Sequence, residues 1–230
     1  MSDVTCKLSE LGYTIHARQM PAVGNPNPPK DLSEDIAAMD AMVEEAIGTA
    51  GNDVIVMCHS WGGIVTGSGL KGLSKTEREK QGKKGGVVRT GYIAAFIVDE
   101  GVSLLDGLGG SRPSWSTVEG PYIHPHDPAI FYNDMPTAVQ AQLFAQIKPH
   151  AFSTFVAKSS GTSWKHIPTS YLLCANDVAI PPQAQQGMID GVQALGADVH
   201  VTRIEAGHSP FFSKVGETVA WVRRVSGEKM

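Results

Sequence analysis

The chain has 230 residues, of which 42% are hydrophobic and 18% are charged, and its formal net charge is −4 at pH 7. These values are typical of one large globular domain or two small ones, and they argue against a disordered chain or a general nucleic-acid binder. No apolar run reaches the ~18–20 residues that a membrane-spanning helix needs. The chain has three cysteines, too few for a disulfide framework, and residues 1–7 lack the apolar stretch of a signal peptide. We therefore expect a cytoplasmic protein.

The first 50 residues predict two helices and one strand. Apolar residues three or four positions apart predict a short helix over residues 3–11, which Gly12 ends. The β-rich segment Tyr13–Met20 is predicted to be a strand. The next ten residues contain four prolines, which excludes regular structure there. A second helix with one apolar face then begins, capped by Asp31 or Ser33.

The rest of the chain alternates predicted strands with predicted helices. The strands are continuous apolar or β-rich runs, as expected where both faces of a parallel sheet are covered: Val54–Cys58, Gly86–Ile97, Ser170–Cys174 and Val199–Ile204. The helical patterns lie between and after them, over Gly62–Leu73, Gln183–Leu195 and Phe212–Val225. This alternation predicts a doubly wound α/β sheet with helices on both faces.

The alternation stops between Asp99 and His166. This insert carries eight of the sixteen aromatic residues of the chain in under a third of its length. We expect a core of residues 1–98 and 167–230, with residues 99–166 inserted into it.

The clearest chemical signal is the segment Cys58–Gly63, which reads CHSWGG. It follows a buried strand and precedes a helix. A serine on such a tight turn exposes its hydroxyl and directs the next backbone N–H at a developing oxyanion. Gly62 provides the small neighbour that this turn needs, whereas Cys58 stands where a second glycine is usual. The nucleophile pattern G-x-S-x-G is therefore half matched, and a serine in an ordinary glycine-rich turn is the alternative.

Two possible partners of Ser60 follow later strands. Asp177 comes directly after the third of these strands and His208 comes after the fourth. A serine hydroxyl needs a base to remove its proton, and a carboxylate orients that base. The order Ser60, Asp177, His208 is that of a hydrolase triad on an α/β sheet.

The chain resembles the α/β-hydrolase superfamily, in the small branch of esterases, methyl esterases and hydroxynitrile lyases. Four segments carry the resemblance: His59–Gly63, Tyr92–Phe96, Tyr171–Asp177 and Gly207–Pro210. It implies that Ser60 is the nucleophile, His208 the general base and acid, and Asp177 the residue that orients His208. It also implies that the Trp61 N–H supports the oxyanion and that residues 99–166 form a helical cap.

Within this branch, the resemblance favours hydrolysis. Hydroxynitrile lyases of this type carry a lysine directly after the catalytic histidine, where this chain has Ser209. We therefore predict a serine hydrolase that cleaves a small-to-medium apolar ester, thioester or lactone. The alternatives are a non-hydrolytic relative that binds, isomerises or cyclises an apolar substrate, and a lyase.

The resemblance also predicts a gap at the start of the chain. In the family, further strands and an oxyanion loop precede the first helix seen here, and that loop supplies a second oxyanion N–H. Three explanations stay open: a truncated product, a rebuilt sheet, or a strand supplied by another chain. We expect the N-terminal strands to be missing or replaced, and the protein to be a homo-oligomer, perhaps strand-exchanged, or to have a rebuilt sheet.

The expected partner is a small apolar molecule, with no nucleic acid, no membrane, no cofactor and no metal. The residues expected to line its pocket are large side chains at strand ends or in the insert: Trp61, Phe96, Trp115, Tyr132, Phe155 and Phe211.

Overall fold

The computed structural model describes residues 3–229, and at its centre is a four-stranded parallel sheet in the order β1-β2-β6-β7. Its strands are β1 (Asp53–Ser60), β2 (Gly86–Ala95), β6 (Thr169–Cys174) and β7 (Val199–Ile204). Each strand forms over a run of residues that is rich in apolar side chains, as buried parallel strands require. The predicted α/β fold with a mostly parallel sheet is confirmed.

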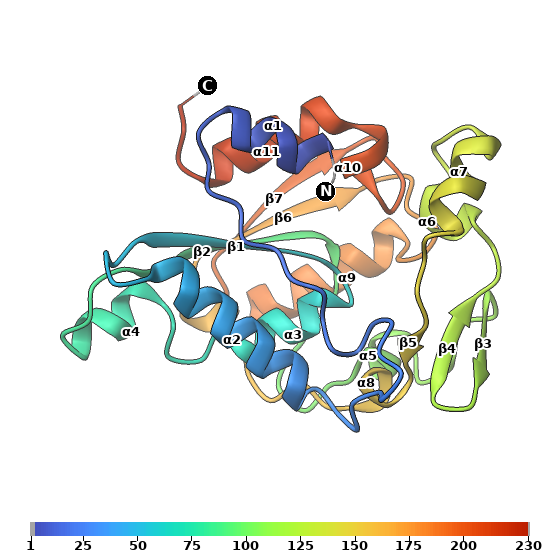
Figure 1. The fold of residues 1–230 in the computed structure, drawn as a ribbon, viewed down its shortest axis with the longest axis horizontal. Coiled ribbons are helices and arrows are strands. Elements are labelled where there is room, and N and C mark those ends of the chain that lie inside the picture. The colour runs from blue at the N-terminus through green and yellow to red at the C-terminus, as the bar shows by residue number, and fades with distance from the viewer. Residues whose placement is uncertain (1–2, 230) are drawn as a thin grey trace.

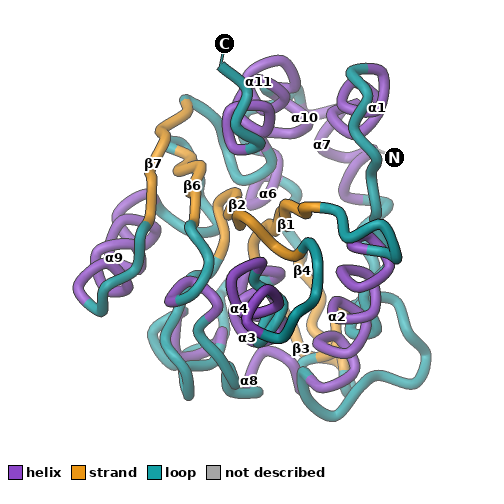
Figure 2. The backbone as a smooth tube through the Cα atoms, turned by 90° about the vertical axis from the view of Figure 1, so that its left-hand side faces the viewer, coloured by secondary structure: helices purple, strands orange, loops and turns teal. Residues whose placement is uncertain are grey.

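Helices cover both faces of this sheet (Figure 1). One layer contains α1 (Asp3–Glu10), α10 (Pro210–Ser213) and α11 (Val215–Val225). The other contains α2 (Ser33–Ile47), α3 (Gly62–Gly69), α4 (Lys75–Lys80) and α9 (Pro182–Ala194), and Figure 2 shows the two layers on opposite sides of the strands.

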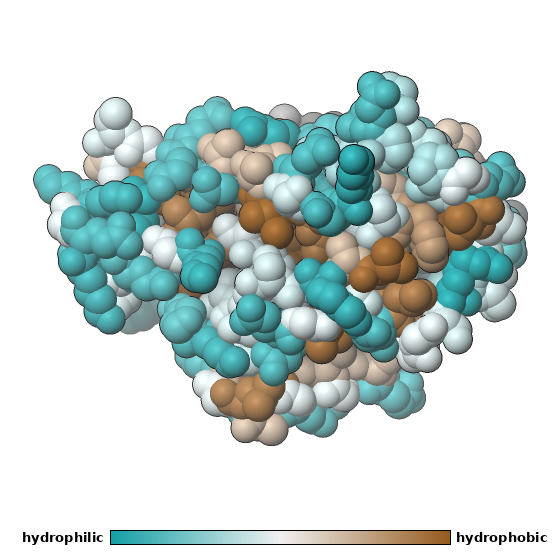
Figure 3. All heavy atoms as spheres, turned by 90° about the horizontal axis from the view of Figure 1, so that it is seen from below, coloured by the Kyte–Doolittle hydropathy of each residue, from teal (hydrophilic) through white to brown (hydrophobic). Residues whose placement is uncertain are grey.

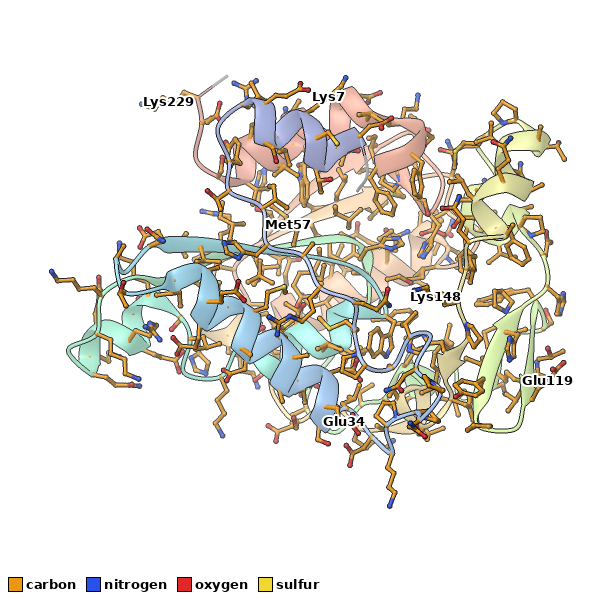
Figure 4. All side chains as sticks on the ribbon, viewed as in Figure 1. Lys7, Glu34, Met57, Glu119, Lys148 and Lys229 are labelled. Atoms are coloured by element: carbon orange, nitrogen blue, oxygen red, sulfur yellow. The ribbon has the colours of Figure 1, made fainter. Side chains whose placement is uncertain are left out.

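Alternate residues of β1 pack into different layers because successive side chains of a strand point to opposite faces. Ile55 and Met57 pack toward α1 and α11, whereas Val54 and Val56 pack toward α2 and α3. Figure 4 shows Met57 between the sheet and α1. The strand that ends at Ser60 is thus held by apolar contacts on both of its faces.

The prediction of a strand over Tyr13–Met20 is wrong, because the structure has no regular secondary structure there. A strand needs a neighbour that takes up its backbone hydrogen bonds, and in the described sheet β1 pairs only with β2. The segment instead packs Tyr13 and Ile15 beside Met57. Exchange of a strand between two copies of the chain stays a prediction.

Three helix boundaries also differ from the prediction. Helix α3 ends at Gly69, and the helix predicted over Phe212–Val225 is divided into α10 and α11 at Lys214. Leu32 precedes α2 without a side-chain cap, although the Asp31 carboxylate accepts a hydrogen bond from the backbone N–H of Ser33 at 2.8 Å.

The insert between β2 and β6 contains a small antiparallel sheet beside its helices, on the right of Figure 1. Its elements, in chain order, are α5 (Leu104–Gly107), β3 (Ser116–Glu119), β4 (Tyr122–Pro125), α6 (Ala129–Tyr132), α7 (Thr137–Phe144), β5 (His150–Ala151), α8 (Ser153–Val156) and the 3-10 helix Ser163–Lys165. The boundaries of a cap at residues 99 and 166 stay a prediction.

The surface seen from below mixes hydrophilic and apolar residues (Figure 3). Large apolar side chains that are exposed, such as Leu11 and Leu195, come from different parts of the chain. Within residues 3–229, no helix combines the length and the apolar character of a membrane-spanning segment.

The loop before α2 is tied both to the insert and to α2. The Ala22 carbonyl accepts a hydrogen bond from the Ala151 N–H at 2.8 Å, and the Gly24 N–H donates to the Pro149 carbonyl at 2.8 Å. On the other side, the fully buried Asp35 accepts a hydrogen bond from the Ala22 N–H at 3.0 Å. Burial raises the pKa of this carboxyl from 3.8 to about 6.

We predict that Asp35→Asn removes part of the pH dependence of stability. A carboxyl whose pKa is raised by folding stabilises the fold when it is protonated, and this contribution is lost as the pH rises through about 6. Between pH 4 and pH 8, the free energy of unfolding of Asp35→Asn should therefore gain up to about 3 kcal/mol relative to the unsubstituted protein. Denaturant unfolding at both pH values measures this, with the exposed Asp40→Asn as control, and parallel pH profiles for Asp35→Asn and the unsubstituted protein would contradict it.

Candidate active site

Ser60 lies on a strained turn between β1 and α3. Its φ is +54°, a left-handed conformation that is unfavourable for a residue with a side chain. The turn is tight because a Cβ atom on Gly63 would lie 2.1 Å from the carbonyl oxygen of Phe96. A Cβ atom on Gly62 would lie 3.7 Å from the Cβ of Cys58, which is ordinary contact, so the turn tolerates cysteine at position 58.

Asp177 and His208 form a buried pair at the ends of two neighbouring strands. The Nδ1 atom of His208 lies 2.8 Å from Oδ2 of Asp177, and both residues are at most 3% exposed. The other carboxylate oxygen of Asp177 accepts hydrogen bonds from the backbone N–H groups of Ala179 and Ile180, at 2.8 and 2.9 Å. With Nδ1 donating to the carboxylate, Nε2 of His208 is the nitrogen available as a base.

Ser60 and His208 line the same small cavity, of about 240 Å³. Strands β1 and β7 are separated by two strands, so the loops after them bring the two residues together. In the described residues, no hydrogen bond joins the Ser60 hydroxyl to His208. Hydrogen bonds of this kind are often long in active sites and shorten when a substrate binds.

Gln185, on the first turns of α9, holds Asp177 from behind and is missed by the sequence analysis. This fully buried side chain places Nε2 3.1 Å from Oδ2 of Asp177 and 2.7 Å from the carbonyl of Ile180. Its Oε1 accepts a hydrogen bond from the Cys174 N–H at 3.1 Å. The sequence pattern that could have revealed Gln185 is a polar residue on the same apolar helix face as Ile189 and Val192.

His59 supports the loop of His208 from the side of β1. Its Nε2 lies 2.8 Å from the carbonyl oxygen of His208, so this nitrogen donates, and the two imidazole rings are 4.5 Å apart. Burial lowers the pKa of His59 to about 3, which keeps it neutral. The structure thus gives His59 a hydrogen bond to the backbone of His208 rather than to Ser60.

Two further residues, which the sequence analysis missed, join the insert to the loops that carry Asp177 and His208. Asp134 accepts hydrogen bonds from the Gly207 N–H at 2.7 Å and from the Ser213 hydroxyl at 2.6 Å. The Asn133 amide donates to the carbonyl of Asn176 at 2.9 Å. The neighbours of both His208 and Asp177 are therefore held from the insert.

A larger cavity, of about 410 Å³, opens on the other side of Ser60. Of the six residues expected in the pocket wall, four line this cavity: Trp61, Phe96, Trp115 and Phe155. Tyr132 and Phe211 line the smaller cavity next to His208 instead. His150, which the sequence analysis did not single out, also lines the larger cavity.

Comparison with known proteins gives a consistent family. A family model described as "Alpha/beta hydrolase family" matches residues 7–221. A protein named "Probable hydrolase R7" from Phoma sp. is 32% identical over 225 residues, which cover 93% of this chain and 88% of that protein.

Solved structures share the fold. A pyrethroid hydrolase from Sphingobium faniae superimposes with a TM-score of 0.72 at 17% identity, covering 97% of this chain and 90% of that one. Polyneuridine aldehyde esterase gives a TM-score of 0.71 at 16% identity, covering 97% and 92% of the two chains. At such identities the likeness concerns the fold alone.

We predict that Gln185→Leu lowers both stability and any activity that uses Asp177. The exchange leaves the buried Cys174 N–H without its acceptor and removes a donor from Asp177, which together should lower the free energy of unfolding by about 2–4 kcal/mol. Thermal and denaturant unfolding measure the loss. Gln183→Leu, an exposed exchange on the same helix, is the matched control. Equal stability of the two variants would show that the buried amide holds nothing in place.

Proposed function

The chain belongs to the α/β hydrolase family, and on that premise we propose that it is a serine hydrolase that cleaves small-to-medium apolar esters, thioesters or lactones. The observation that carries the proposal is the buried 2.8 Å contact of Asp177 with His208, which lines the same cavity as Ser60. A histidine oriented by a carboxylate next to a serine on a strained turn is the arrangement that activates a hydroxyl nucleophile.

The proposed reaction has two steps. The Ser60 hydroxyl oxygen attacks the substrate carbonyl while Nε2 of His208 takes its proton, and the Trp61 N–H stabilises the oxyanion. His208 then gives the proton to the leaving oxygen or sulfur, and the acyl group stays bonded to Ser60. Water, deprotonated by His208, attacks this acyl-enzyme, and His208 gives that proton to the departing Ser60 oxygen, which releases the acid and the free Ser60 hydroxyl. Asp177 keeps the imidazole oriented in both steps.

The two cavities support a proposed position for each part of the substrate. His208 must reach the leaving atom, and it lines the smaller cavity. The leaving group therefore belongs on that side, and the acyl group belongs in the larger cavity, whose wall is formed mainly by apolar side chains. Because the wall is mainly apolar, we expect the acyl group to be apolar.

A second candidate is a non-hydrolytic protein that keeps the same pocket. Trp61 supplies a single oxyanion N–H in the proposed reaction, and loss of one such donor lowers the rate about a hundred- to a thousandfold in tested enzymes. Lyase activity is less favoured, because the buried Ser209 stands where lyases of the resembling branch carry lysine.

We predict that Ser60→Ala lowers kcat/KM for 4-nitrophenyl butanoate by at least about a thousandfold, because the variant lacks the attacking oxygen. A fluorophosphonate should add one phosphonyl mass to the unsubstituted chain, located at Ser60 by peptide mass spectrometry, and none to the variant.

Ser9→Ala, an exposed exchange on α1, is the matched control and should retain activity and labelling. A folded chain that neither hydrolyses esters nor takes up the label would overturn the proposal in favour of the binding protein. Full activity in Ser60→Ala would assign the chemistry to another nucleophile.

A further inference from the structure

His150 occupies the wall of the larger cavity close to Ser60. It is the first residue of β5, and the centroid of its ring lies 4.5 Å from that of Trp61 and 4.9 Å from that of Phe155, with both pairs of rings nearly perpendicular. Because Trp61 directly follows Ser60, an acyl group attached to Ser60 has His150 within the same cavity.

The hydrogen bonds of Thr154 determine which nitrogen of His150 carries the proton. The Thr154 hydroxyl donates its one hydrogen to the carbonyl of Ala151 at 2.9 Å. The same oxygen lies 3.1 Å from Nε2 of His150, so it can only accept there. Nε2 of His150 therefore carries the proton, and Nδ1 is left as an acceptor.

This acceptor has no hydrogen-bond partner among the described residues, and the ring is neutral at ordinary pH. Burial lowers the pKa of His150 to about 4. A neutral imidazole whose Nε2–H is already hydrogen bonded can offer only the lone pair of Nδ1. It therefore favours a ligand group that donates a hydrogen bond over one that accepts a hydrogen bond.

Three other polar side chains of the cavity wall are exposed to solvent. These exposed residues of the cavity wall are Gln19, Gln146 and Lys148. Figure 4 shows Lys148 between the core and the strands β3 and β4. Water can satisfy these three groups, whereas His150 is half-buried against the rings of Trp61 and Phe155. An acceptor in such a place gains from a ligand or a water that donates a hydrogen bond to it.

We propose that His150 is a specificity residue that accepts, through Nδ1, a hydrogen bond from a hydroxyl group on the acyl part of the substrate. The ligand class is an apolar, preferably aromatic, acyl group that bears an alcohol or phenol. The assignment to the acyl part rests on the proposed function, while the hydrogen bond itself does not require catalysis.

The test compares two small ligands of nearly equal shape, 4-ethylphenol and 1-ethyl-4-fluorobenzene, whose dissociation constants are measured by ligand-observed NMR titration. The first offers an O–H donor and the second does not. His150→Phe should lower the preference for the phenol about tenfold, the worth of one hydrogen bond. The preference should not change between pH 6 and pH 8, because His150 stays neutral over that range.

Two conservative variants distinguish the contribution of Nδ1 of His150 from that of Nε2. An asparagine amide reaches the position of Nδ1 and a glutamine amide that of Nε2, so His150→Asn should keep more of the phenol preference than His150→Gln. The matched control is His124→Phe on β4, where Ile123 and Pro125 line the cavity and His124 does not. Circular dichroism establishes that each variant is folded, and His150→Gln serves as the loss variant if His150→Phe is not folded.

An unchanged phenol preference in folded His150→Phe or His150→Gln would overturn the inference, even in an active esterase. A His150-dependent preference in a chain that hydrolyses no ester would support the hydrogen bond and reject the proposed function. The two failures are therefore distinguishable.

Discussion

The contact between His208 and Asp177 is the interaction on which the site depends, and much of the fold serves to make it possible. A carboxylate that is nearly inaccessible to water is tolerable only when its oxygens are hydrogen bonded. Asp177 has such partners on both oxygens: two backbone N–H groups on one, and Gln185 together with His208 on the other. Parallel pairing of β6 with β7 is what brings the two loops to the same edge of the sheet.

The environment gives the three histidines near Ser60 different tasks. His59 and His150 are both held neutral by burial, and each has a ring nitrogen whose role is set by a single contact, to the His208 carbonyl and to Thr154 respectively. Only His208 among them faces a carboxylate. The carboxylate thus distinguishes His208, which the proposed reaction uses to accept and return a proton, from His59 beside its loop and His150 in the cavity wall.

The sequence predicts the parts of this arrangement that local pattern controls. The run Val54–Cys58 indicates a buried strand, and the positions of Ser60, Asp177 and His208 just after strands of one predicted parallel sheet indicate a common site. The strand predicted over Tyr13–Met20 fails because strand formation depends on a neighbour, which no local pattern reveals. For a similar reason, the sequence does not reveal Gln185, Asp134 and Asn133. Their roles come from contacts with residues that are distant in the sequence.

The position of β1 has a consequence for the motions of the site. In the described sheet, β1 is the outermost strand and is hydrogen bonded to β2 on one side only. Outer strands open more readily than central ones, because fewer hydrogen bonds must break at once. Ser60 ends this outer strand, whereas Asp177 and His208 follow strands on the other side of β2. Breathing of a single strand can therefore move Ser60 away from Asp177 and His208 while the rest of the sheet stays intact, so the proposed triad would be interrupted by local opening of β1 without global unfolding.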